Sequence, residues 1–481
     1  MNQRAPQEAR SPLELLRRFQ LTLEDVHAHV IDPPQLRDSK VAIDSPASRY
    51  PRRSRFSQIF SFFYTLNIEK FEKAVHDLLK SCVMGYALEL RSGGAILLSK
   101  QYNYSKNYND GLLGWSVDTP MHVASVSKLI TAMAMTQLLR DHGIAFDDKI
   151  APWLPQYWPR GINVHNLTFR HLLTHTSGLL APIKAPGPMD FQSMKDAIAL
   201  GTTDLTTRDY KNVNYSLCRV LLTTINGDAY PSMLITADSI FAPLFAVRDS
   251  VWDTLSIRAH LQYVNDNIFT PSVLPARDFN RPDEAALAYL AIYDNLPGWN
   301  SGDKQSGSGA IGWHLTVREL LRVMATYRRS GKIVGAWRAQ KMLDDGIGVD
   351  FEFTRDTRLG RLYAKGGFWG SKEGRIEQTN AFFLPGIPFL PNLFDAAVCN
   401  VVVSNEKDYH KVDKRVRPGA DEECCGVVAC GDCIIAPNRP ASRPRIATRD
   451  SEPVRPRGTP AAARSGSISA ALVLQTPCRI W

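Results

Sequence analysis

The chain has 481 residues, of which 44% are hydrophobic and 22% charged, proportions that indicate a sizeable buried core and one or two domains. Its formal net charge is +9, but residues 1–66 carry +3 and residues 411–481 carry +5, so residues 67–410 carry only +1. A protein built to bind nucleic acid shows its positive charge on the folded body, so this distribution argues against a nucleic-acid partner.

Residues 1–55 mix Pro, Ser, Arg and Asp and predict an extension, with one short helix near Leu13–Phe19. The first residues are polar and no apolar segment follows them, which argues against a secretory signal and favours a cytoplasmic protein. The apolar run Ser57–Asn67 is eleven residues long, too short to span a bilayer, so a packing segment is favoured over one on a membrane surface. We assign residues 1–66 to a largely disordered N-terminal extension.

Regular structure is predicted to begin at Ile68. Apolar residues recur at helical spacing over Ile68–Leu79, which predicts an amphipathic helix. The next two runs, Val83–Leu90 and Ala95–Ser99, are strand-like and flank a Ser-Gly-Gly turn. This pattern is typical of a β-hairpin.

A second helix is predicted over Ser125–Arg140, ending at Asp-His-Gly. Helical and irregular segments then alternate to about Arg329, and strand-like runs return at Leu362–Ala364, Asn380–Leu384 and Ala396–Ser404. We expect the hairpin and the late strands to share one antiparallel sheet flanked by helices, with a mainly helical second region between them. This is the α+β class.

Residues 411–481 are rich in Arg, Pro, Ala and Ser without periodicity, so we predict a disordered tail that follows a domain over residues 67–410. Five of the eight cysteines lie in this tail, and the other three are far apart, which favours a reduced setting over a disulfide framework. The tail contains one Cys-x-x-Cys pair, but its cysteines are too crowded for a good zinc site.

The first motif with chemical meaning is Ser125-Val126-Ser127-Lys128, at the start of the second helix. A serine hydroxyl is a poor nucleophile until a base accepts its proton. Residues three apart lie nearly one helical turn apart, so Ser125 and Lys128 share a face, and the helix N-terminus offers N–H groups to a developing oxyanion. Alone the motif is weak, because such common residues match it by chance roughly once or twice in a chain of this length.

The second motif is Tyr210-Lys211-Asn212. A tyrosine hydroxyl acts as a general base only where neighbouring cations lower its pKa, and Lys128 with a second lysine would do so. Asn212 offers an amide that can orient substrate or Lys128. Taken alone, the motif is better explained as a loop tyrosine beside an Asx-type turn.

The third motif is Lys365-Gly366-Gly367-Phe368, directly after the strand-like Leu362–Ala364. Two glycines here would let a substrate backbone approach the strand edge closely. Lys365 would then face a substrate carboxylate and Tyr210. Taken alone, the motif is better explained as a glycine turn beside a surface lysine.

Together the three motifs, separated by 85 and 155 residues, resemble the serine β-lactamase and penicillin-binding-protein-like superfamily, especially its class C branch with related carboxypeptidases, D-aminopeptidases and esterases. The resemblance runs over about Ile68–Glu406. It includes the approach Thr119–Ala124 to the first serine, the loop His171–Leu179 and the glycine-rich stretch Gly307–Ala310. The resemblance implies the β-lactamase/transpeptidase-like fold of this superfamily. It also implies a serine hydrolase that forms an acyl-enzyme on a small ester or amide without a cofactor.

By the same resemblance, Ser125 is the nucleophile, and Lys128 and Tyr210 share the general-base role. The resemblance implies a substrate-binding set that orients substrate, binds its anionic end and supplies the oxyanion hole through the N–H groups of Ser125 and Phe368; its members are Asn212, Lys365, Gly366, Gly367 and Phe368. One departure matters, because the superfamily commonly has Lys-Thr-Gly and this chain has Gly366 in place of the threonine. The lost hydroxyl favours small esters or D-amino acyl amides over β-lactams.

Two alternatives remain open from the sequence. His171 and His175 are four residues apart, but there is no glutamate in the metalloprotease position and no third ligand at a telling spacing, so we expect no metal. The chain is also compatible with a structural or scaffolding relative of weak activity. The joint presence of all five polar motif residues favours the enzyme.

Overall fold

The computed structural model describes residues 65–66, 68–80, 83–92, 95–180, 189–233, 244–290, 296–351, 354–357, 360–371, 375–384, 394–402 and 434–435. The predicted helix near Leu13–Phe19, the tail cysteines and most of both predicted extensions lie outside these residues. Two residues from each extension do pair, as the short strands β1 (Thr65–Leu66) and β11 (Ile434–Ile435).

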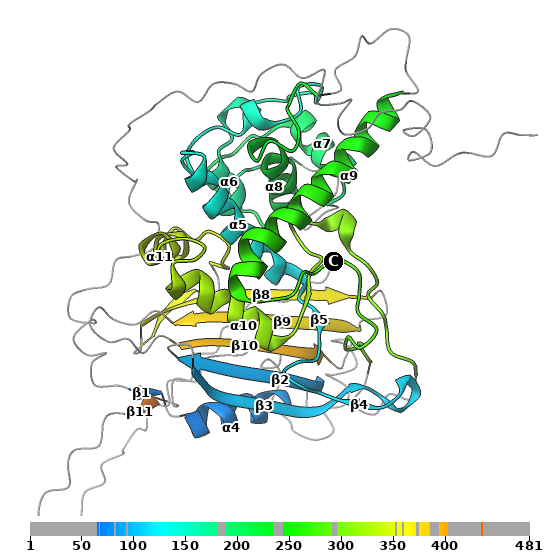
Figure 1. Cartoon of the computed structure of the whole chain (residues 1–481), viewed down its shortest axis with the longest axis vertical. Coiled ribbons are helices and arrows are strands. Elements are labelled where there is room, and N and C mark those ends of the chain that lie inside the picture. Colours follow the sequence, from blue (N-terminus) through cyan, green and yellow to red (C-terminus); the bar gives the residue numbers. More distant parts are fainter. Residues whose placement is uncertain are drawn as a thin grey trace, which may run out of the picture.

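The main sheet runs in the order β4-β3-β2-β10-β9-β8-β7, and every neighbouring pair is antiparallel. The early hairpin and the late strands therefore share one sheet, as the sequence predicted (Figure 1). A separate short pair joins β5 (Met121–His122) to β6 (His314–Leu315). The strands of the main sheet are β2 (Val83–Ser92), β3 (Ala95–Lys106), β4 (Leu113–Gly114), β7 (Arg355–Thr357), β8 (Gly360–Gly370), β9 (Ile376–Leu384) and β10 (Phe394–Val402).

Helices cover both faces of this sheet. On one face lies α4, whose bounds Ile68–Leu79 match the prediction and whose Glu72 pairs with Lys100 of β3 at 2.7 Å. On the other face lies α10, whose Arg318 Nε approaches Glu89 Oε2 of β2 at 3.6 Å. The described helices are α4 (Ile68–Leu79), α5 (Ser127–Asp141), α6 (Phe169–Leu173), α7 (Phe191–Leu200), α8 (Asn212–Ile225), α9 (Leu244–Val264), α10 (Val317–Ala325) and α11 (Ala336–Asp344).

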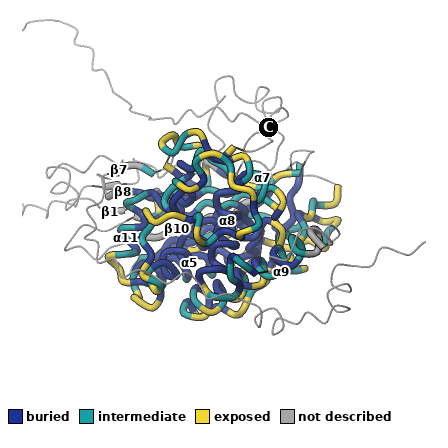
Figure 2. The backbone as a smooth tube through the Cα atoms, turned by 90° about the horizontal axis from the view of Figure 1, so that it is seen from above, coloured by how far each residue is buried: buried dark blue, intermediate teal, exposed yellow. Residues whose placement is uncertain are grey.

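The helical region between the two halves of the sheet packs around α5 and α8, which lie in its centre (Figures 1 and 2). Every residue of α8 and all of α5 from Ser127 to Leu139 are buried, so neither helix has a solvent face. The apolar stripe predicted a helix over Ser125–Arg140, and a helix enclosed on all sides needs no polar face. The segment also begins differently, with a 3-10 turn over Ala124–Val126 before α5.

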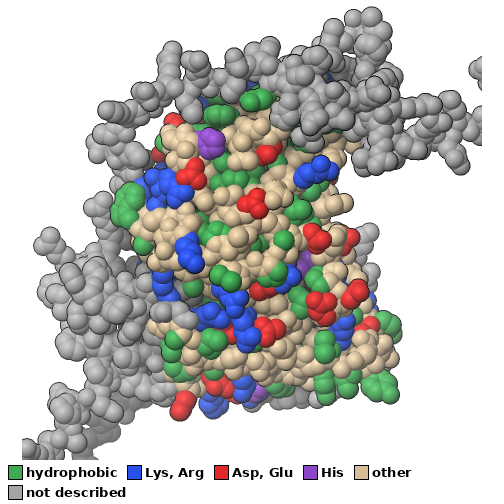
Figure 3. Space-filling model, in the orientation of Figure 1, with side chains coloured by type: hydrophobic (Ala, Val, Ile, Leu, Met, Phe, Trp, Pro, Cys, Tyr) green, Lys and Arg blue, Asp and Glu red, His purple; other side chains and the backbone are tan. Residues whose placement is uncertain are grey.

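Charged side chains of both signs lie interspersed on the face shown in Figure 3. Ion pairs of partly exposed side chains in the described residues include Arg318 with Asp118 at 2.6 Å and Lys195 with Asp249 at 2.7 Å. This mixture agrees with the net charge of +1 counted over residues 67–410.

Candidate active site

The three sequence motifs meet where β8 passes the start of α5. A Cβ added at Gly367 of β8 would lie 2.6 Å from the carbonyl oxygen of Val123 and 2.8 Å from the backbone nitrogen of Ser125. Only a glycine allows this approach, which explains the second glycine of Lys-Gly-Gly. Ala124 has a φ of 47°, a left-handed conformation that costs a non-glycine residue about 1–3 kcal/mol and that recurs at functional sites.

Ser125 receives two hydrogen bonds on its hydroxyl oxygen. Lys128 Nζ donates one at 2.9 Å, and the Tyr210 hydroxyl donates the other at 2.8 Å. Lys128 lies on the same side of the helix start as Ser125, as its spacing of three predicted. Tyr210 comes from a segment 85 residues further along the chain, so tertiary packing alone places it on the serine.

Lys128 is fully buried, and the hydrogen bonds that its ammonium group donates to described residues go to neutral oxygens. Besides Ser125 it donates to Asn212 Oδ1 at 2.8 Å and to the carbonyl oxygen of Ala310 at 3.0 Å. Burial lowers the pKa of Lys128, and the charge of Lys365 lowers it further, although Tyr210 opposes both. A depressed pKa raises the fraction of neutral amine, the form that can accept a proton.

Tyr210 lies between two lysines, with Lys128 Nζ and Lys365 Nζ each 5.1 Å from the centre of its ring. Burial by itself would raise the pKa of Tyr210, but the two positive charges outweigh it, and the pKa lies below its ordinary value of 10. His175 supports the ring from another side, at 4.3 Å between ring centres. The two lysines therefore make it easier for Tyr210 to lose its proton than for an ordinary tyrosine.

Lys365 contacts a residue that the motifs did not reveal. Its Nζ lies 2.6 Å from Asp350 Oδ1, and the backbone N–H of Gly366 donates to Asp350 Oδ2 at 2.8 Å. Burial would lower the pKa of Lys365, but Asp350 outweighs burial and raises it. The only local signal for Asp350 was an aspartate two residues after the Gly346-Ile347-Gly348 turn, which is not specific.

The free edge of β8 carries the backbone groups of even-numbered residues. Strand β7 pairs only with residues 360–362 of β8, whereas β9 pairs with residues 363–370 on the opposite side. The Ala364 carbonyl accepts from the Asp350 N–H at 2.8 Å, and the Gly366 N–H also points to Asp350, so these groups face away from β9. By the alternation of an antiparallel ladder, the Phe368 N–H points the same way, towards the side where Ser125 lies.

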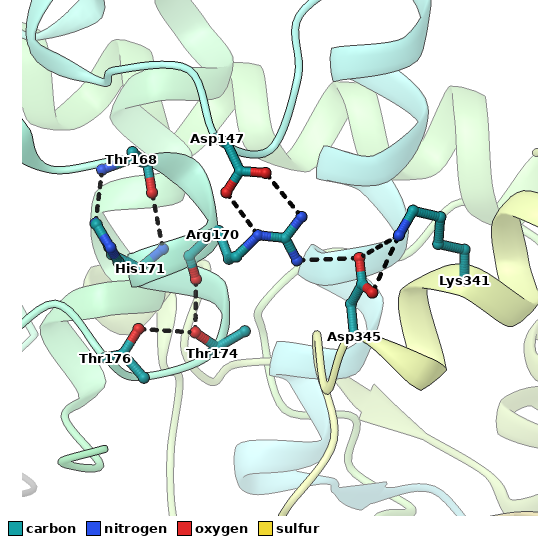
Figure 4. Close-up of polar contacts among 8 residues, drawn as sticks. All are labelled: Asp147, Thr168, Arg170, His171, Thr174, Thr176, Lys341 and Asp345. Atoms are coloured by element: carbon teal, nitrogen blue, oxygen red, sulfur yellow. Dashed lines mark hydrogen bonds and ion pairs between the residues drawn. The ribbon is translucent and has the colours of Figure 1, made fainter. Parts of the chain in front are cut away.

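Arg170 and the His171–Leu179 loop that follows it position the pocket from the side of the helical region. Arg170 binds Asp147 through two nitrogens, at 2.7 and 3.0 Å, and Asp345 at 3.0 Å, and Asp345 also pairs with Lys341 (Figure 4). These contacts tie α6 to the end of α11, shortly before Asp350. Next in the loop, His175 Nδ1 lies 3.3 Å from the Lys211 backbone nitrogen, which donates to it, so this loop also fixes the start of α8.

His171 and His175 have separate structural contacts. His171 Nδ1 accepts from the Thr168 N–H at 3.2 Å and caps α6, while His175 packs on Tyr210. Within the described part of the chain, no group of three or more His, Cys, Asp or Glu side chains is arranged to hold a metal ion. A search of the same residues finds no helix with the length and hydropathy needed to cross a bilayer.

A second polar group is buried beside the pocket, where β5, β6 and β9 meet. His122 Nδ1 lies 3.5 Å from Glu377 Oε2, and the rings of His122 and His314 are 5.2 Å apart. None of their side-chain polar atoms forms a hydrogen bond with the described residues. Burial lowers the pKa of both histidines to about 3 and raises that of Glu377 to about 7, although Ser301, Arg281 and Lys304 act to lower the latter.

Comparison with known proteins identifies the family. The family model described as Beta-lactamase matches residues 71–418, most of the chain, so the chain belongs to this family. Over 182 residues it is 27% identical to the putative penicillin-binding protein PbpX of Bacillus subtilis (strain 168), covering 37% of this chain and 43% of that protein. Over 64 residues it is 42% identical to the esterase EstB of Burkholderia gladioli, covering 13% and 16%.

The chain thus spans less than half the length of these curated relatives in the matched segments. Among solved structures, the octameric penicillin-binding protein homologue from Pyrococcus abyssi has a TM-score of 0.48 and 14% identity, covering 74% of this chain and 79% of that one.

Proposed function

We propose that this chain is a serine hydrolase that forms an acyl-enzyme on Ser125 with a small ester or amide. The observation that carries the proposal is the pair of hydrogen bonds on Ser125 Oγ, at 2.9 Å from Lys128 and 2.8 Å from Tyr210. Membership of the Beta-lactamase family and the similarity to an esterase and to a penicillin-binding protein support the same reaction class.

In the first half-reaction, Ser125 Oγ attacks the carbonyl carbon of the substrate and its proton moves to the Lys128 and Tyr210 pair. The N–H groups of Ser125 and Phe368 donate to the oxyanion that forms. The carbonyl then re-forms as the bond to the leaving group breaks, and the base pair returns the proton to the departing alcohol or amine. In the second half-reaction water attacks the acyl carbon and loses a proton to the same pair. The bond between the acyl carbon and Ser125 Oγ then breaks, the pair returns the proton to Oγ, and the acid product leaves.

The substrate class follows from the β8 edge. Gly366 offers no hydroxyl for a substrate carboxylate, so the preference that such a donor creates is lost. Phe368, which is 68% exposed, and the partly exposed Trp369 follow the two glycines on β8 and offer apolar surface on opposite faces of this strand. We therefore propose neutral small esters or D-amino acyl amides as better substrates than β-lactams.

The test is covalent labelling with a fluorescent fluorophosphonate, read by intact-mass spectrometry and peptide mapping. The wild type is expected to gain one adduct on Ser125, and Ser125→Ala is expected to lose both labelling and turnover. Ser127→Ala is the matched control, because Ser127 is fully buried two residues away and contacts only the Trp313 N–H, at 3.4 Å. An adduct on Ser127, or a correctly folded wild type that neither labels nor turns over any ester, contradicts the proposal and favours the scaffolding alternative.

A further inference from the structure

Lys365 and Gly366 together form a binding site for a carboxylate. An ammonium group and a backbone N–H that point to the same place can each bind one carboxylate oxygen. The site lies beside the nucleophile, because Lys365 Nζ is 5.1 Å from the ring centre of Tyr210, whose hydroxyl contacts Ser125. Tyr210 is also placed to protonate the leaving group, so the site lies on the leaving-group side of the scissile bond.

That site is occupied by a side chain of the same protein. Asp350 Oδ1 binds Lys365 Nζ at 2.6 Å and Asp350 Oδ2 binds the Gly366 N–H at 2.8 Å, so both donors are used. The backbone of Asp350 also pairs with the strand edge, through its N–H to the Ala364 carbonyl at 2.8 Å. Asp350 and Lys365 are 6% and 3% exposed, so the pair is closed to solvent rather than resting on the surface.

The segment that carries Asp350 is fixed from both sides. Before it, the Gly348 N–H donates to the Tyr215 hydroxyl at 3.0 Å, and that hydroxyl donates to the Leu173 carbonyl at 2.7 Å. Gly348 has a φ of 75°, and a Cβ there would lie 2.6 Å from Ala132, so the turn requires glycine. After it, the Thr354 N–H and hydroxyl both bind the Asp350 carbonyl, at 3.0 and 2.9 Å.

We propose that Asp350 is a specificity-determining residue: an internal carboxylate that takes the place of a substrate carboxylate and restricts the enzyme to substrates with an uncharged leaving group. A carboxylate on an incoming leaving group would find both donors occupied and would lie against a like charge. A neutral group meets no such cost. This inference rests on the proposed hydrolase activity at Ser125.

The experiment compares two esters of the same acid. They are 3-carboxyphenyl acetate and its methyl ester, 3-(methoxycarbonyl)phenyl acetate, which differ by one methyl group that removes the charge of the leaving group. For each enzyme the measured quantity is the ratio of kcat/KM for the charged ester to kcat/KM for the neutral ester. The wild type is expected to favour the neutral ester.

Asp350→Ala vacates the site and Asp350→Asn removes only its charge. In Asp350→Ala the ratio is expected to rise by about ten- to a hundredfold, the value of one regained hydrogen bond to a charged group, with a smaller rise in Asp350→Asn. The matched control is Asp209→Asn, which removes an aspartate paired with Lys211 at 2.7 Å and not in contact with Lys365. Its ratio is expected to stay within about threefold of the wild type, because screening weakens exposed charges.

The inference is overturned if the wild type prefers the charged ester, or if both Asp350 variants turn over the neutral ester with an unchanged ratio. It is also tested without a variant, by inhibition of wild-type turnover of the neutral ester with benzoate. Little inhibition supports an occupied site, and strong competitive inhibition overturns it. Absence of a Ser125 adduct and of all turnover in the wild type would instead contradict the proposed function, so the two failures are distinguishable.

Discussion

The pocket contains two buried lysines that flank one tyrosine at equal distance, and their surroundings drive their pKa values in opposite directions. Lys128 contacts three neutral oxygens, and its pKa is lowered. Lys365 contacts the carboxylate of Asp350, and its pKa is raised. Burial disfavours both charges, so the difference comes from the anion. A buried lysine without a neighbouring carboxylate loses its proton more easily, whereas a buried lysine paired with a carboxylate holds its proton more firmly.

Glu377 is a buried acid to which the same effect of burial applies with the opposite sign. It is a buried carboxylate without a hydrogen bond to any described residue, and burial raises its pKa to about 7. The pKa shifts of Lys128 and Glu377 thus both favour the neutral form, whereas that of Lys365 favours the charged form. Buried charged groups without an ion-pair partner are therefore expected to change protonation state more easily than the paired Lys365 and Asp350.

The largest expected effect is on turnover. Lys128→Met removes one of the two proposed proton acceptors on Ser125 and is expected to lower kcat/KM on a neutral ester by about 10²–10⁴-fold, the usual contribution of a general base. Lys365→Met removes only one of the two charges that hold down the pKa of Tyr210, so its loss is expected to be smaller. Steady-state kinetics on p-nitrophenyl acetate measures both, and equal losses would remove the distinction between the two lysines.

Stability is expected to show the opposite order. Lys365→Met leaves the buried carboxylate of Asp350 without its cation, which is expected to lower the free energy of unfolding by about 3–5 kcal/mol. Lys128→Met leaves no charge behind and is expected to cost far less. Urea unfolding followed by tryptophan fluorescence measures both, and the double variant Lys365→Met with Asp350→Asn should recover much of the loss. A double variant as unstable as Lys365→Met alone would show that the ion pair is not the cause.

The smallest expected effect is a pH dependence of stability from Glu377. Its pKa is raised from 4.5 in the unfolded chain to about 7 in the folded one, so the unfolded chain releases this proton first and stability falls as pH rises between those values. Glu377→Gln removes this contribution. The unfolding free energy of the wild type relative to the variant is expected to fall by about 3 kcal/mol from pH 4.5 to pH 7.5. A constant difference across that range would show that Glu377 is already ionised in the folded protein.

The sequence by itself determined the local elements and the chemistry of single motifs. The apolar spacing over Ile68–Leu79 gave the observed bounds of α4, and a spacing of three placed Lys128 on Ser125. Periodicity and spacing along a helix are properties of residues close in sequence, so they can be recognised without knowledge of the rest of the fold. The hairpin and the sharing of one sheet by early and late strands were predicted on the same basis.

Strand lengths and partners were decided by the tertiary structure. The strand-like run predicted at Leu362–Ala364 left open whether Gly366 and Gly367 form a turn, and β8 continues through both because β9 pairs with this segment. Likewise β3 extends to Lys106, well past the predicted end at Ser99, because it pairs with β2 as far as Asn103 and then with β4. A strand ends where its neighbours stop pairing with it, and that is not encoded in its own residues.

Some residues of the pocket could be identified from the sequence, and others were revealed only by the tertiary structure. Ser125, Lys128, Tyr210, Asn212 and Lys365 were identifiable as motifs, although only folding brings Tyr210 within 2.8 Å of a serine 85 residues away. His175, the Ala310 carbonyl and Asp350 carried no specific signal, because a backbone oxygen has no side chain to recognise and a lone aspartate after a glycine turn is common. Which lysine keeps its charge is decided by Asp350, a contact between segments that only the packed structure brings together.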